Sequence, residues 1–237
     1  MRSDERQGPF ARWLTSRSQS DEISEIARQV RDEHLTYLDE AKMGLLESSV
    51  REVRRVRGDF LEMGVALGGS AIVLADLMGR RRHFHGYDVF AMIPPPGEQD
   101  PPAVHERYRT IVEGRSEGIG GDTYYGYLDD LYDRVVAAFA AHGMTVDGKR
   151  IALHKGLFED TLHPDGPVAL AHVDCDWYEP VKLCIERVWP ALSPGGLIIF
   201  DDYNDYGGCT QAVDEFAAAE PTATLRTTVP TAVLVKA

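Results

Sequence analysis

Short apolar segments alternate with helical segments along most of this chain, and this alternation limits the folds open to it. The segments with the composition of strands are 59–64, 83–88, 150–154, 169–174 and 197–200. The segments with a helical pattern are 70–78, 127–142, 181–192 and 213–219. Strands that alternate with helices in this way predict an α/β fold, with a doubly wound and mostly parallel sheet.

The C-terminal end of the chain departs from this alternation. Segments 222–228 and 231–236 both have the pattern of strands, and only a short turn around Pro230 separates them. Without a helix between them they predict an antiparallel hairpin at one edge, which brings the sheet to seven strands. In such sheets ligands bind outside the carboxyl ends of the strands.

Two regions lie outside this pattern. Residues 1–57 form an N-terminal segment that is helical from about Asp21 to Arg57, and Gly58 ends it. We expect this segment to cap the pocket, to contact another subunit or simply to pack on the core. Residues 58–237 form the main domain, in which an irregular loop at about 91–127 has the length of a lid or substrate loop.

Composition narrows the class of partner. With 25 basic and 38 acidic residues the formal net charge is −13, which disfavours nucleic acid and anionic membranes as partners. Three cysteines without metal-ligand spacing suggest reduced thiols and a cytoplasmic protein. The N-terminus lacks the apolar stretch of a signal peptide, and the apolar runs are too short to span a bilayer.

A glycine-rich turn follows the first predicted strand. It runs from Glu62 through Gly64 and Gly68 to Ser70, and its spacing is not the dinucleotide fingerprint Gly-x-Gly-x-x-Gly. Glycines allow close approach of a ligand, and the start of the next helix offers N–H groups to an anion. Because Glu62 has the charge to bind an ammonium group, S-adenosylmethionine fits this turn. A turn without a ligand is the alternative.

Asp88 ends the second predicted strand. A carboxylate at this place can accept hydrogen bonds from the hydroxyls of a ribose. The same position would serve NAD, so Asp88 supports a nucleoside-containing cofactor without choosing between the two. An exposed loop acid is the alternative.

Three aspartates follow two other predicted strands. Asp174 ends one of them, and Asp201 and Asp202 end the next. Neighbouring parallel strands lie about 4.8 Å apart, so these carboxylates would repel one another without a cation. Oxygen ligands favour Mg²⁺ or Ca²⁺ over zinc. Asp176 is a further acid that would assist the cation, accept a proton or cap the following helix.

The third predicted strand ends near His154 and Lys155. The residues that follow, Gly156 to Phe158, have the character to line an adenine ring, and His154 or Lys155 would then reach a substrate. A simple turn with solvated charges is the alternative, and for the His and the Lys individually it is the favoured one.

Taken together, these motifs resemble the macrocin, mycinamicin and novobiocin type of O-methyltransferases, which act on sugar hydroxyls of natural-product glycosides. The resemblance covers roughly residues 35–220. The matching segments are Glu62–Ser70, Asp88-Val89-Phe90, Gly156–Thr161, Asp174–Glu179 and Asp201-Asp202-Tyr203.

The resemblance implies a class I methyltransferase (Rossmann-like) fold that uses S-adenosylmethionine and Mg²⁺. The implied metal ligands are Asp174, Asp201 and Asp202. The implied cofactor-binding residues are Glu62, Gly64, Val65, Gly68, Ser70, Asp88, Gly156, Leu157, Phe158 and Asp174.

A more distant resemblance to catechol O-methyltransferases places the metal at the same three positions, but that family has Asp-Asn where this chain has Asp201-Asp202. Its general-base lysine corresponds to Trp177 here. The base is therefore left open among Asp174, Asp176, His154, a loop residue and metal-bound water.

Other functions remain as alternatives to an O-methyltransferase of a sugar. They are methylation of a phenolic or catechol small molecule, metal-independent methylation, an NAD-type oxidoreductase and a noncatalytic ligand-binding protein. We further expect a small-molecule substrate and a homo-oligomer, a dimer or higher.

Overall fold

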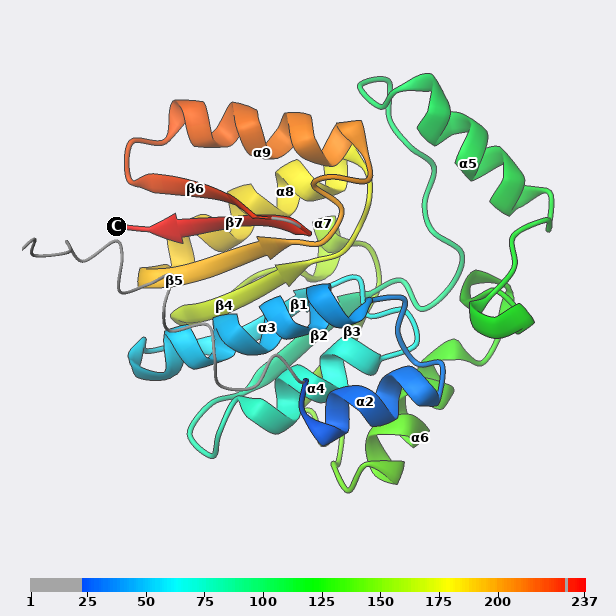
Figure 1. Ribbon diagram of the computed structural model, residues 1–237, viewed down its shortest axis with the longest axis horizontal. Helices are drawn as coiled ribbons and strands as arrows, with labels where there is room; N and C mark the ends of the chain where they lie inside the picture. Colours follow the sequence, from blue (N-terminus) through cyan, green and yellow to red (C-terminus); the bar gives the residue numbers. More distant parts are fainter. Residues whose placement is uncertain (1–22, 229) are drawn as a thin grey trace, which may run out of the picture.

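The computed structural model describes residues 23–228 and 230–237. One sheet of seven strands runs through it in the order β3-β2-β1-β4-β5-β7-β6, as Figure 1 shows. The strands are β1 (Asp59–Met63), β2 (Phe84–Asp88), β3 (Ile151–Lys155), β4 (Val168–Val173), β5 (Leu192–Phe200), β6 (Ala223–Thr228) and β7 (Thr231–Lys236). The first five are parallel, and β7 pairs antiparallel with both β5 and β6. The predicted mostly parallel sheet with an antiparallel edge hairpin is confirmed.

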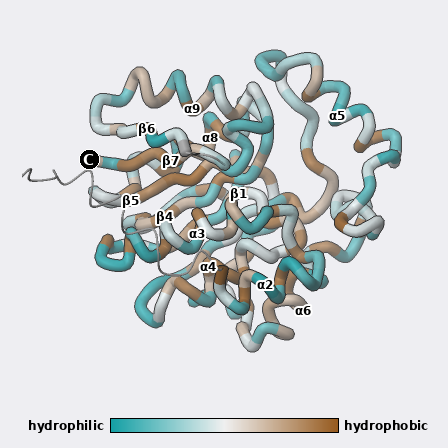
Figure 2. Tube along the Cα trace, in the orientation of Figure 1, coloured by the Kyte–Doolittle hydropathy of each residue, from teal (hydrophilic) through white to brown (hydrophobic). Residues whose placement is uncertain are grey.

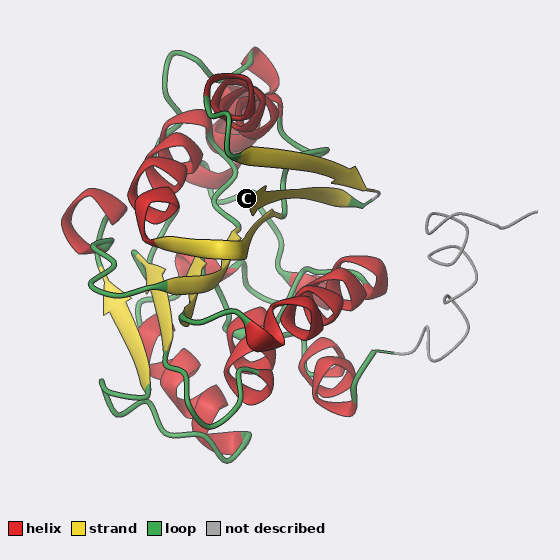
Figure 3. Cartoon of the chain, turned by 90° about the vertical axis from the view of Figure 1, so that its left-hand side faces the viewer, coloured by secondary structure: helices red, strands yellow, loops and turns green. Residues whose placement is uncertain are grey.

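Helices cover both faces of this sheet (Figure 3). They are α2 (Glu25–Asp32), α3 (Glu40–Glu52), α4 (Gly69–Leu77), α5 (Pro102–Val112), α6 (Leu131–Ala141), α7 (Phe158–Thr161), α8 (Tyr178–Val188) and α9 (Gly207–Ala219). Successive strand residues point to opposite faces, so that Ile198 belongs to the core under α8 and α9 while Ile199 belongs to the core under α2, α3 and α4. Both faces of the inner strands are therefore apolar, and much of the trace of β5 is brown in Figure 2.

The N-terminal segment is two helices where the sequence predicted one continuous helical pattern. Ser24 caps α2 and Asp39 caps α3, each accepting a hydrogen bond from a backbone N–H in the first turn of its helix. Between the helices the chain turns at His34, whose φ is 58°. Both helices pack on α4 and share the core of the main domain.

The long loop is less irregular than the sequence suggested. It contains α5, which begins after Pro101 with Pro102 in the first turn, where a proline is pre-organised for a helix. Val104 and Ile111, one on each end of α5, are buried. In Figure 1 this helix stands apart from the helices that cover the sheet.

The predicted turn at Ser193–Gly196 lies within β5. Val168 pairs with Leu192, but Leu170 pairs with Leu197, so the extra residues of β5 form an irregularity in the ladder. The turn-forming residues thus bend a strand where we expected them to precede one.

None of the helices in the described part of the chain is long and apolar enough to cross a membrane. Residues 1–22, which include the expected start of the helical pattern near Asp21 and the N-terminus that we expect to lack a signal peptide, lie outside the described residues.

Candidate functional site

The ends of β1, β4 and β5 bring the predicted acids to one edge of the sheet. The backbone N–H of Asp174 donates to the carbonyl of Met63 over 2.8 Å, and that of Asp201 donates to Val173 over 2.9 Å. The ladder therefore continues just past the strands and fixes the places where these side chains leave the backbone.

The glycine-rich turn fits against this edge only because Gly64 has no side chain. Gly64 has a φ of 92°, and a Cβ added to it would lie 1.7 Å from the backbone oxygen of Asp174. Gly68, also left-handed with a φ of 93°, precedes the first residue of α4. The N–H of Gly69 is already taken, because it donates to the carbonyl of Leu35 over 2.9 Å.

Two cavities open at this edge. One, of about 170 Å³, is lined on one side by Leu157, Phe158 and Pro95. The other, of about 290 Å³, is lined by Asp174, Asp176, Asp201, Asp202 and Asp205 together with Tyr124, Tyr206 and Arg107. The lining residues that both cavities have in common are Gly64, Asp88, Ile93, Tyr125 and Asp174. An apolar cavity and an acidic cavity therefore adjoin each other at the glycine-rich turn.

Three carboxylates crowd together in the acidic cavity. Oxygen atoms of Asp174, Asp176 and Asp202 all lie within 4.8 Å of one another, close enough to share one cation. Burial raises the pKa of all three well above the usual value, and the charges of neighbouring aspartates raise them further. When all three carboxylates are ionised they repel one another, and no positive charge within the group compensates them.

Asp176 enters this group through an unusual backbone conformation. Its φ is 61°, in the left-handed region that few residues other than glycine adopt. Its N–H donates to Oδ2 of Asp202 over 3.1 Å. Strain of this kind is often retained where it aims a functional side chain.

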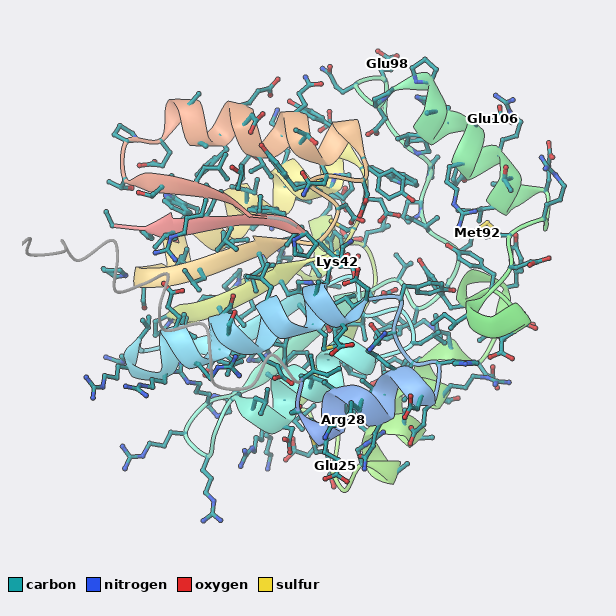
Figure 4. All side chains as sticks on the ribbon, in the orientation of Figure 1. Glu25, Arg28, Lys42, Met92, Glu98 and Glu106 are labelled. Carbon is teal, nitrogen blue, oxygen red and sulfur yellow. The ribbon has the colours of Figure 1, made fainter. Side chains whose placement is uncertain are left out.

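Asp201 has different neighbours. Its Oδ2 lies 2.9 Å from Nζ of Lys42, which also binds Asp205 over 2.7 Å. Figure 4 shows Lys42 extending from α3 toward the strand ends. Burial opposes ionisation of Asp201, but His172 and Lys42 outweigh it and lower its pKa. In the metal set implied by the resemblance, Asp201 is thus the member that already has a cationic partner.

A buried ion pair lies beneath these residues. Nδ1 of His172 is 2.8 Å from Oε1 of Glu62, and its Nε2 is 3.9 Å from Oδ1 of Asp201. Burial raises the pKa of Glu62, although the hydrogen bond to His172 counteracts it. Oε2 of Glu62 makes no well-formed hydrogen bond to any part of the chain that the structure describes.

The carboxylate of Asp88 is engaged by the turn itself. Oδ2 accepts hydrogen bonds from the N–H groups of Val65 and Ala66, and Oδ1 accepts one from Phe90. Asp88 nonetheless lines both cavities, beside Val65 and Ser70 in the acidic one. For the predicted contact with a ribose, the Asp88 oxygens would have to accept hydrogen bonds from the ribose hydroxyls in addition to those from the backbone.

The structure places one predicted residue apart from the two strand-end cavities. His154 lies in a separate cavity, where its ring stacks on Tyr87 with centroids 4.5 Å apart and its Nε2 is 3.2 Å from Nδ1 of His85. It projects from β3 away from the strand-end cavities because side chains alternate along a strand. His154 therefore lines neither of the two cavities that meet at the glycine-rich turn. Gly156 lines neither strand-end cavity, but its N–H donates to the carbonyl of Asp88.

The sequence reasoning missed two charged residues of the site. His172 had a signal, because it is a titratable residue inside an apolar strand and lies two positions before Asp174, on the same side of the strand. No pattern in the sequence pointed to Lys42, because its partner Asp201 is 159 residues away in the chain.

Comparison with known proteins places these features in a family. The sequence model described as Macrocin-O-methyltransferase (TylF) matches residues 15–232. The 8-demethyl-8-(2,3-dimethoxy-alpha-L-rhamnosyl)-tetracenomycin-C 4'-O-methyltransferase of Streptomyces olivaceus is 32% identical over 167 residues, which cover 68% of this chain and 58% of that protein. The demethyldecarbamoylnovobiocin O-methyltransferase of Streptomyces niveus is 29% identical over 175 residues, covering 69% of this chain and 59% of that protein. The alignments therefore span less than two thirds of these relatives.

A solved structure shares the fold. The O-methyltransferase NovP superimposes with a TM-score of 0.70 at 23% identity, covering 88% of this chain and 87% of its own. Its similarity supports the class I methyltransferase fold expected from the sequence.

Proposed function

Because this chain belongs to the macrocin-O-methyltransferase (TylF) family, we propose that it transfers a methyl group from S-adenosylmethionine to a sugar hydroxyl of a natural-product glycoside. The observation that carries the proposal is the meeting of the two strand-end cavities at Gly64 and Asp174. An apolar cavity suits adenine, an acidic one suits a cation and a hydroxyl, and the reacting atoms would lie where they join.

Two features of the residues fit the cofactor. Leu157 lines the apolar cavity and is 45% exposed, so the fold leaves much of its apolar side chain open to solvent. A bound adenine ring would bury that surface. Oε2 of Glu62 is a buried carboxylate oxygen without a well-formed hydrogen bond to the described residues, although the nearby Ser70 hydroxyl helps to lower the pKa of Glu62. An ammonium group of the bound cofactor would satisfy it.

The acidic cavity also fits a divalent cation. Carboxylate oxygens are the ligands that Mg²⁺ prefers, and the mutual repulsion of the aspartates is relieved by a positive charge. We propose Asp174, Asp201 and Asp202 as the residues that hold it. Asp176, which lies beside Asp174 and Asp202, would then stand next to a hydroxyl bound near the cation.

Asp176 is the base in this proposal. When bound, S-adenosylmethionine supplies a methyl group whose carbon–sulfur bond breaks as the acceptor oxygen bonds to the carbon, and the cation lowers the pKa of that hydroxyl. The proton passes to the carboxylate of Asp176, which lines the acidic cavity, whereas His154 does not. The remaining catalytic effect comes from the alignment that the strand ends impose.

The surrounding side chains suit a sugar. Tyr124, Tyr125 and Tyr206 line the acidic cavity, and Arg107 lies with its guanidinium carbon 6.0 Å from the ring centre of Tyr124. Aromatic faces pack on the C–H faces of sugars, and an arginine can bind their hydroxyls. The relative from Streptomyces olivaceus, whose name specifies a 4'-O-methyltransferase of a rhamnosyl compound, supports the same class of acceptor.

We assign the N-terminal helices to the pocket. Leu35, Thr36, Leu38 and Lys42 line the acidic cavity, so the described part of residues 1–57 acts as a cap over the site and not only as a core element. The proposed assembly into a homo-oligomer stays a prediction.

A crystal structure with S-adenosylhomocysteine and MgCl₂ tests the cofactor and cation sites together. We expect the amino group at Glu62, adenine against Leu157 and Phe158, and the cation within reach of Asp174 and Asp202. Occupancy of the cleft by neither ligand, or a cation bound outside the acidic cavity, would contradict the proposal.

A further inference from the structure

A second charged cavity lies at the opposite ends of the strands. We call this cavity, which measures about 710 Å³, the arginine cleft. The arginines that line it are Arg54, Arg57, Arg80, Arg81 and Arg82. Asp59, His83 and Pro167, at the amino ends of β1, β2 and β4, complete part of its wall. Figure 1 shows the end of α3 and the turn after α4, which carry these arginines, on the side of the molecule away from α5.

Four of these arginines have no partner among the described residues. Within the described residues, Arg54, Arg57, Arg80 and Arg81 are exposed and form neither a hydrogen bond nor an ion pair through their side chains. Several exposed arginines elsewhere are paired, as Arg115 is with Glu113 and Arg134 with Asp130. Unpaired guanidinium groups thus gather in one place on a protein whose net charge is −13.

The cleft has little negative charge of its own. The one carboxylate among its described lining residues is Asp59, which lies 3.3 Å from Nδ1 of His83. Like charges held close together create a positive local potential, and a bound anion lowers the energy of such a group.

Arg82 fixes the frame of the cleft. Its guanidinium donates to the carbonyls of Gly58, Val53 and Val56 over 2.6, 2.9 and 2.7 Å, and stacks over Phe60 at 5.0 Å. These bonds tie the turn after α3, which carries Arg54 and Arg57, to the residues just before β2. Arg82 therefore holds in place the backbone that carries Arg54 and Arg57 and the backbone that carries Arg80 and Arg81.

The chemistry of the cleft selects phosphate groups. Guanidinium groups bind phosphate oxygens in pairs of parallel hydrogen bonds, and four of them exceed the need of a single carboxylate or monophosphate. A long polyanion such as nucleic acid would meet the acidic remainder of the surface, which a small ligand avoids. We propose that the arginine cleft binds a small ligand that carries two or three linked phosphate groups.

Two sources of this chemistry are a free polyphosphate and a nucleoside polyphosphate. Val56 and Met78 add apolar surface to the lining, and the volume exceeds that of a triphosphate alone. If a nucleoside is attached, these residues contact it, and its affinity exceeds that of the inorganic anion.

The competing explanation is that the arginines serve the helices. α3 and α4 both end close to the cleft, and cations near a helix C-terminus stabilise its dipole. That explanation requires the arginines for stability and predicts no anion binding.

Calorimetric titration of the full chain in EDTA tests the proposal, first with inorganic triphosphate and then with ATP, at physiological ionic strength. The variant is Arg54→Gln/Arg81→Gln, and the matched control is Arg115→Gln/Arg134→Gln, which removes the same charge from exposed positions elsewhere. Chelation removes divalent cations that would carry phosphates to the acidic cavity.

We expect triphosphate to bind the unaltered chain and the control, and the variant to bind it roughly tenfold or more weakly. Tighter binding of ATP identifies a nucleoside ligand, and equal binding identifies a free polyphosphate. Absence of binding to the unaltered chain, or equal loss of affinity in the control, would overturn the proposal. A variant that melts at a lower temperature but binds as tightly as the unaltered chain would establish the helix-dipole explanation instead.

Discussion

Lys42 of α3 and Asp201 at the end of β5 form an ion pair of 2.9 Å between residues 159 positions apart in the chain. The side chain of Lys42 is 16% exposed and that of Asp201 is 9% exposed, so the pair is shielded from solvent. This contact joins the N-terminal helices to the acidic cavity. The positive charge of Lys42 on the N-terminal helices therefore affects the net charge of the proposed cation site.

Removal of this lysine is expected to strengthen cation binding. The Lys42→Met substitution leaves Asp201 and Asp205 without their positive partner, and we expect Mg²⁺ affinity to rise roughly tenfold. Calorimetric titration with MgCl₂ measures it, with the exposed Lys155→Met as the matched control. Unchanged or weaker Mg²⁺ binding would contradict the proposed cation site.

The role of Asp176 is tested by separating turnover from cation binding. If Asp176 accepts the proton, Asp176→Asn lowers kcat by roughly 10²- to 10⁴-fold and leaves Mg²⁺ and S-adenosylhomocysteine affinities nearly unchanged. Asp205→Asn, in the same cavity but paired with Lys42, serves as the control. A variant that loses Mg²⁺ affinity instead would make Asp176 a ligand and leave the base to be found.

Gly64 is expected to be irreplaceable for a steric reason. In Gly64→Ala the new methyl group overlaps the backbone of Asp174, so we expect destabilisation by more than about 2 kcal/mol and loss of cofactor affinity. Gly143→Ala is the matched control, since Gly143 also has a positive φ, of 74°, but a Cβ there meets nothing within 4 Å. It should lose only about 1 kcal/mol. Urea unfolding measures both, and equal losses would show that backbone conformation alone explains Gly64.

The stacked histidines away from the site predict how stability depends on pH. Burial lowers the pKa of His85 and of His154 below 6.5, so the unfolded chain binds protons more readily than the folded one. The contribution of these two histidines to stability is therefore complete above the unfolded pKa and falls as pH decreases from about 6.5 toward the lowered folded values. His154→Asn should reduce the loss in the free energy of unfolding between pH 7.5 and 5.5, and His105→Asn should not. An identical loss in all three proteins would contradict this assignment.

Local patterns predicted the framework of this protein. Apolar strands with acidic ends, and the positive-φ glycines of the Glu62–Ser70 turn, act over a few residues, so the sheet and its edge hairpin followed from the sequence. The family resemblance drawn from those motifs is confirmed by the match over residues 15–232.

Contacts between distant residues were beyond such patterns. The break between α2 and α3 depends on two caps and a turn that the apolar spacing does not record. The pairing of Lys42 with Asp201 depends on packing across the whole domain. The direction of the His154 side chain was also beyond the sequence, because the position of a residue at the end of a strand does not determine which way its side chain points.

The most direct test of the central claim is transfer of an isotopically labelled methyl group from S-adenosylmethionine to a panel of glycosides and phenols, with EDTA and then with added MgCl₂. The account predicts label on a sugar hydroxyl, lost with EDTA and restored by Mg²⁺. Undiminished transfer with EDTA, or label that reaches only phenols, would contradict it.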